Sequence, residues 1–144
     1  MNTENKAKKS DTLRSYIKRN IVAQEWYGIR TDLFRFMQTC IKEGHFTQTE
    51  QNRYEELLDD FGRFENAIED NPGLNDTFKQ TAYEELSLLY GLHHFVLKYG
   101  SDESKTRPLI EMMQETLSKC KKIERIYWGG FVKKSVYLIF YDRF

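Results

Sequence analysis

An uncharged run of twelve residues, LSLLYGLHHFVL, occupies positions 86–97 of a chain in which 31% of the residues are charged. The run lies inside a longer pattern of apolar residues at helical spacing. A helix that is apolar nearly all round has to be covered on nearly all sides. We therefore expect a hydrophobic helix at about 76–99 to form the centre around which the other helices pack.

Length and composition favour one helical domain. The chain has 144 residues and a hydrophobic content of 40%, enough to bury a core without disulfides or metals. Only two prolines and eight glycines interrupt it, which favours a few long helices over many short strands. We predict an all-α, compact single-domain bundle of five or six helices over residues 11–144, preceded by a disordered basic arm at 1–10.

The first half of the bundle has recognisable start and stop signals. Ser10 or Asp11 can cap a helix whose apolar stripe continues to about residue 43, and Gly28 leaves open whether this is one helix or two. Next, Thr47 and Glu50 match a capping box. The apolar spacing that follows predicts a helix over 47–70, with an acidic outer face, on the flank of the central helix.

The second half ends in an ambiguity. A helix is expected from about Pro108 to the pair Gly129 and Gly130. Beyond it, residues 136–141 (VYLIFY) are uncharged and rich in strand-forming types. The segment 131–144 is therefore either a short helix against the bundle, which we favour because no other segment offers a matching strand, or a strand that pairs with a second copy or a partner.

The cysteines and the N-terminus bear on localisation. Cys40 and Cys120 fall on predicted apolar helix faces and form no metal-type cluster, which is typical of buried free thiols in a reducing compartment. The N-terminal residues are polar, unlike a signal peptide, and the uncharged run is far shorter than the roughly 20 residues that span a bilayer. We expect a cytoplasmic protein that does not contact a membrane.

Charge is segregated along the chain although its net value is zero. Residues 43–85 carry three basic and twelve acidic side chains, whereas 1–42 and 98–144 are both basic. Either an acidic helix pairs with basic neighbours inside the bundle, which is the simpler explanation, or an acidic face meets a basic partner.

Motifs for catalysis, metals and cofactors are not found in the sequence. Of the three histidines, His93 and His94 are adjacent and so cannot face one ion from a regular helix, and no Glu-x-x-His or His-x-x-x-His pattern occurs. No zinc-type cysteine pattern, nucleophile elbow or phosphate-binding loop is present. We expect no catalytic residue, no metal and no cofactor.

Protein binding is the hypothesis that fits these features best. Aromatic residues make up 15% of the chain and are the types enriched at interfaces. The expected function is that of a non-enzymatic interaction or regulatory protein, adaptor-like or inhibitor-like, that is a homo-oligomer or binds another protein. The candidate contacts are an aromatic patch and an acidic helix face: Trp26, Tyr27, Tyr127, Trp128 and Tyr137, with Glu55, Glu56, Asp59 and Asp60.

Two alternatives belong to other functional classes. Nucleic-acid binding would use the N-terminal basic arm and a second basic cluster, because phosphates require grouped cations. That cluster consists of Lys119, Lys121, Lys122, Arg125, Lys133 and Lys134. The second alternative is a small enzyme or ligand carrier with an interhelical pocket near His93 and Gly91.

Overall fold

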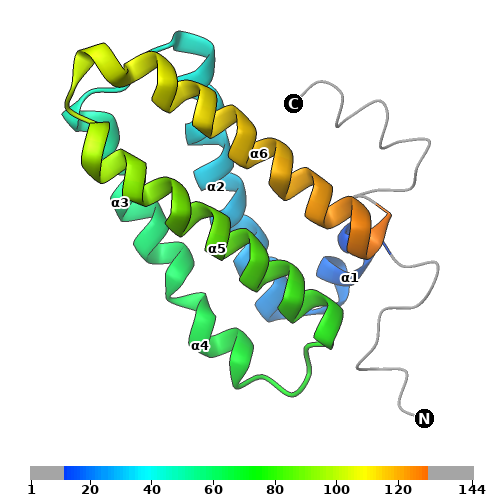
Figure 1. Cartoon of the computed structure of the whole chain (residues 1–144). Coiled ribbons are helices and arrows are strands. Elements are labelled where there is room, and N and C mark those ends of the chain that lie inside the picture. The colour runs from blue at the N-terminus through cyan, green and yellow to red at the C-terminus, as the bar shows by residue number, and fades with distance from the viewer. Residues whose placement is uncertain (1–11, 130–144) are drawn as a thin grey trace.

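A computed structural model describes residues 12–129 of the chain (Figure 1). This range forms six α-helices and one 3₁₀ helix, and it contains no strand. The helices are α1 (Leu13–Arg19), α2 (Ile21–Glu43), α3 (Gln48–Gly62), α4 (Phe64–Glu69), α5 (Asp76–Tyr99), the 3₁₀ helix η2 (Glu103–Lys105) and α6 (Thr106–Trp128). The prediction of a compact all-α bundle of five or six helices is confirmed.

Four long rods make up the bundle. The helix α5 packs against α6 on one side and against α3 on the other, and α2 closes the ring by contacting both α3 and α6. The short α1 lies against α2, and α4 continues the line of α3 toward the beginning of α5. This arrangement places α2 and α5 diagonally across the core.

The hydrophobic helix has the predicted bounds but is not covered as predicted. Its N-cap is Asn75, whose side chain accepts from the Phe78 amide, and it runs from Asp76 to Tyr99. Within its uncharged run, however, Tyr90, Phe95 and Leu97 are 42%, 40% and 55% exposed. The expectation that this run is covered on nearly all sides was therefore wrong, because α3 and α6 leave the outer side of α5 open.

Helix boundaries at the N-terminal end differ from the sequence pattern. Thr12, rather than Ser10 or Asp11, caps α1 by accepting a hydrogen bond from the Ser15 amide. The chain breaks at Asn20, whose side-chain oxygen accepts from two amides of the first turn of α2. The helix α2 then continues through Gly28, so the break exists but lies eight residues earlier than the glycine suggested.

The acidic helix is also divided. The capping box is present, with the Glu50 carboxylate accepting from the Thr47 amide at 2.7 Å. The predicted helix over 47–70 is nonetheless two helices separated at Arg63. Gly62 precedes the break, and a Cβ there would overlap the Tyr90 hydroxyl, so a larger residue would make the Tyr90 side chain move.

Aromatic side chains fill the end of the core where α1, α2 and α5 meet. Trp26 meets Phe78 edge-on, with ring centroids 5.0 Å apart, and Tyr16 stacks on Phe78 at 5.4 Å. Trp128 also packs against Tyr16, with ring centroids 5.3 Å apart. Such pairs add about 0.5–1.5 kcal/mol each beyond burial of their area, so both tryptophans stabilise the fold.

Two expectations concern residues outside this range. The disordered arm at 1–10 and the choice between helix and strand at 131–144 both lie outside the described residues. Gly129 at the end of α6 has a left-handed conformation with φ of 72°, in agreement with the predicted stop.

Two glycines of α2 predict opposite responses to alanine. Gly28 is exposed within the helix and has no atom within 4 Å of a Cβ position, so Gly28→Ala should raise the free energy of unfolding by about 1 kcal/mol. Gly44 ends the helix at φ of 61°, so Gly44→Ala should lower it by about 1–2 kcal/mol. Urea unfolding of both variants measures the difference, and equal effects would contradict the assignment.

Candidate functional site

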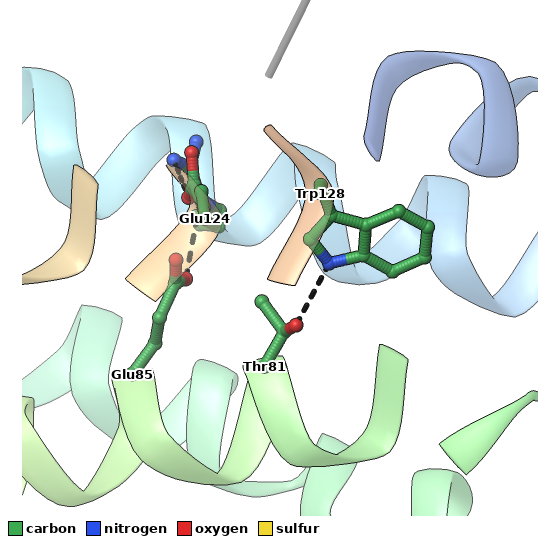
Figure 2. A network of polar contacts seen from close by, with 5 residues as sticks. Thr81, Glu85, Glu124 and Trp128 are labelled. Carbon is green, nitrogen blue, oxygen red and sulfur yellow. Dashed lines mark hydrogen bonds and ion pairs between the residues drawn. The ribbon is translucent and has the colours of Figure 1, made fainter. Parts of the chain in front are cut away.

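A buried ionic cluster joins three helices in the middle of the bundle (Figure 2). Arg30 of α2 lies between Glu85 of α5 and Glu124 of α6, and the three side chains are at most 4% exposed. The Arg30 Nε lies 3.3 Å from Glu85 Oε1, and its Nη2 forms a short ion pair with Glu124. The guanidinium also lies 4.3 Å above the Phe34 ring.

The cluster holds one cation and two carboxyl groups, so its protonation is uneven. Burial, followed by the nearby Glu124 charge, raises the pKa of Glu85 well above its usual range, and Arg30 offsets only part of the shift. This shift favours the protonated form of Glu85. A protonated Glu85 leaves Arg30 and Glu124 as a matched pair of charges.

A second polar contact lies one helical turn away and fixes α6 on α5. The Trp128 indole N–H donates to the Thr81 hydroxyl at 2.8 Å, and that hydroxyl donates to the Thr77 carbonyl at 2.8 Å. Trp128 and Thr81 are 5% and 0% exposed. The indole is thus a core anchor with a satisfied polar atom.

This cluster has acid chemistry but no access to solvent. A carboxyl group with a raised pKa suits general acid catalysis only where it can reach a substrate, and here all three side chains are enclosed. Within residues 12–129, no group of three or more His, Cys, Asp and Glu side chains is placed to hold a metal ion. The arrangement therefore supports a structural role.

The surface offers a different candidate, the exposed outer side of α5. We call it the α5 face; its residues are Ser87, Tyr90, Gly91, His94, Phe95, Leu97 and Lys98. Charges occur only at its ends, at Glu84 and Lys98, because Glu85 is turned into the core. No atom lies within 4 Å of a Cβ placed on Gly91, so the close approach of another backbone that this glycine suggested is not found within the described chain.

Acidic side chains of α3 border the α5 face. Glu55 lies 3.0 Å from the His93 ring, which links α3 to α5. Glu56 and Asp60 form ion pairs with arginines of the same surface, at 3.2 Å and 3.0 Å. Asp59 is exposed and lies near Tyr90. The pKa of the Tyr90 phenol is raised mainly by burial, then by the charge of Glu65, and then by the charge of Asp59.

The aromatic residues selected from the sequence are mostly not on the surface. Trp26 and Trp128 are 1% and 5% exposed, so neither belongs to an exposed patch, because both complete the core at the end of the bundle. Tyr27 is half-buried, and Tyr127 is exposed with its hydroxyl donating to Glu84. Tyr137 lies outside the described residues.

The exposed side chains of α5 were missed. Tyr90, Phe95 and Leu97 lie in the run taken as fully covered. One signal was available in the sequence: a four-helix bundle leaves each helix an outer side, so twelve consecutive residues of one helix cannot all be buried.

The basic cluster is only partly within the described range. Lys119, Lys122 and Arg125 are exposed on α6, and Lys119 lies 3.2 Å from Glu115 on the same helix. Lys121 is half-buried beside a groove of about 560 Å³ between α2 and α6. Lys133 and Lys134 lie outside the described residues. His93 does not line this groove, which is therefore not the pocket expected near that residue.

Comparison with known proteins gives no family. No family model, curated protein or solved structure matches the chain. None of the helices between residues 12 and 129 has the length and hydropathy needed to cross a bilayer.

The ionic cluster predicts a contrast between two substitutions. Arg30→Met should lower the free energy of unfolding by about 3–5 kcal/mol, because it leaves two carboxyl groups buried without a cation. Glu85→Gln should cost far less at pH 7, because the amide resembles the protonated carboxyl group that burial already favours.

The same cluster predicts a pH dependence. The pKa of the Glu85 carboxyl group is higher in the folded than in the unfolded chain. Such a group stabilises the folded protein most at a pH below its unfolded pKa, and this contribution is lost as the pH rises toward its folded pKa. Glu85→Gln should therefore flatten the fall in stability above about pH 5. Urea unfolding of wild type and both variants between pH 5 and 9 measures this, and parallel curves for wild type and Glu85→Gln would refute the assignment.

Proposed function

We propose that this is a non-enzymatic helical interaction protein, of adaptor or inhibitor type, which binds a protein partner on the α5 face. The supporting observation is that Tyr90, Phe95 and Leu97 are all at least 40% exposed on the outer side of α5, where the charged residues Glu84 and Lys98 lie at the two ends. Large apolar side chains grouped on a surface are typical of interaction sites. Aromatic residues of this kind supply much of the binding energy at protein interfaces.

Gly91 leaves room for a partner on the same face, although the exposed helix glycine Gly28 has equally open surroundings. A glycine in a helix interior costs about 1 kcal/mol relative to alanine. No contact within the described chain requires it, since a Cβ would meet open space. A partner backbone that crosses α5 at this position would provide the missing reason.

Nucleic-acid binding has weaker support. Exposed Lys119, Lys122 and Arg125 provide cations on α6, but Glu111 and Glu115 lie exposed on the same helix. The two acids reduce the local positive potential that phosphate binding depends on. An enzyme or carrier role has no support at His93, which is hydrogen-bonded to Glu55.

The proposed location is the cytoplasm, supported by the cysteines. Cys40 and Cys120 are both buried free thiols, which is usual in a reducing compartment. Burial, with smaller effects from Glu50 and Glu43, raises the pKa of Cys40 to about 12, and burial likewise raises that of Cys120.

Thiol reactivity tests whether Cys40 and Cys120 are buried. At pH 8 both thiols should react with Ellman's reagent at least about 100-fold more slowly in the folded protein than in 6 M guanidinium, because burial removes both access and thiolate. An absorbance time course measures the two rates. Fast reaction of either cysteine in the folded protein would contradict the described core.

The interaction itself can be tested by site-specific photo-crosslinking. With p-benzoylphenylalanine in place of Phe95, the full-length protein irradiated in its own cells should give adducts of discrete mass, identified by mass spectrometry as a protein partner or as a second copy of the chain. The same probe in place of Glu111, exposed on α6, is the matched control. Equal labelling at both positions, or none at Phe95, would refute binding at the α5 face.

A further inference from the structure

We infer that the occupant of the α5 face is a basic amphipathic helix of a partner protein, lying along the boundary between α3 and α5. This inference rests on the proposed function and specifies the chemistry of the partner. The boundary is formed by the exposed or half-buried side chains of Glu55, Asp59, Tyr90, His94 and Leu97, and we call it the α3/α5 seam.

The apolar part of the seam has the spacing that a helix recognises. Tyr90 and Leu97 are seven residues apart on α5, so they lie on the same side of the helix about 10 Å apart. Tyr90 leans toward α3, since its hydroxyl lies over Gly62. Helices that bind in grooves use apolar anchors at i, i+3, i+4 and i+7, and Gly91 leaves space for such a helix to approach closely.

The charged part of the seam is acidic. Asp59 and Glu65 form no ion pair with a described residue, whereas Arg53 of α3 and Arg63 at its end are already paired with Glu56 and Asp60. The segment 43–85 as a whole has twelve acidic and three basic residues. Charge complementarity at an interface favours a partner of opposite sign and speeds its association.

A second copy of the chain fits this seam less well. In an antiparallel twofold pairing of α5 with α5, the axis lies between the two helices and keeps the α3 side of one copy on the same side of the interface as the α3 side of the other. Asp59 and Glu65 of the two copies would then lie on the same side of the interface and repel each other. A basic helix meets the same acidic groups with attraction.

Two synthetic peptides are suitable probes. One is an 18-residue helix with leucine on one face and lysine on the other, and the second has the same leucines with glutamate in place of lysine. Titrations of the full chain, followed by fluorescence anisotropy at 50 and 300 mM NaCl, should show binding of the Leu/Lys peptide, weaker at high salt, and no binding of the Leu/Glu peptide.

Variants locate the binding on the seam. The double change Asp59→Lys with Glu65→Lys, and separately Leu97→Ser, should each weaken Leu/Lys binding by about tenfold or more. The control, Glu111→Lys with Glu115→Lys, reverses the same number of charges on α6 and should leave affinity within about twofold. All five positions are exposed, and circular dichroism checks that each variant is folded.

Several results would overturn the inference. These are equal binding of both peptides, equal weakening by the seam and control variants, or a self-associated chain that Leu97→Ser converts to monomer in sedimentation velocity. Crosslinking on the α5 face, with the probe at Phe95 and in a second variant at Leu97 within the seam, separates this failure from failure of the proposed function. If either position captures a protein without a basic helix, or a second copy, only the partner chemistry is wrong; if neither captures anything, both proposals fail.

Discussion

The ion pairs of Arg30 with Glu85 and Glu124 fix how three of the four main helices face one another. An uncompensated charge in a protein interior costs several kcal/mol, so α2, α5 and α6 must keep these three side chains together. With Glu85 held inward, the helical period places Leu89, Leu92 and Val96 in the core. The residues on the opposite side of α5, including the apolar Tyr90, Phe95 and Leu97, are then directed outward whatever their polarity.

Much of the architecture follows from local sequence signals, because helix periodicity and capping act over a few residues. The capping box at Thr47 and the stop at Gly129 lie where the pattern indicates, and α5 has the expected bounds. The breaks at Asn20 and Arg63 were not predicted. The break at Asn20 could have been predicted only by identifying Asn20 as a helix cap inside a continuous apolar stripe. The break at Arg63 follows Gly62, which is in contact with Tyr90 of another helix, and local sequence does not show that contact.

The ionic cluster could not be predicted because its contacts are long-range. Arg30 lies 55 residues from Glu85 and 94 from Glu124, and each resembles an ordinary surface charge in its own helix. The tryptophans illustrate the converse error. Trp128 is near a helix end, where an exposed aromatic residue is plausible, yet Thr81 satisfies its indole inside the core. Hydrophobic periodicity alone cannot distinguish an apolar side covered within the chain from one left open.

Two features of the bundle work against stability, and their positions suggest different reasons. The buried charges cost desolvation, but an alignment that separated them would leave a charge unpaired in the core, so they disfavour other alignments of the helices. Gly91 lowers the helix propensity of α5, and Tyr90 and Leu97 leave apolar area in water. No contact within the described chain offsets either cost. The cost at the surface of α5 is not offset by any contact among residues 12–129, and binding of a partner would offset it. The outer side of α5, rather than the polar core, is therefore the part of this structure that argues most strongly for a partner.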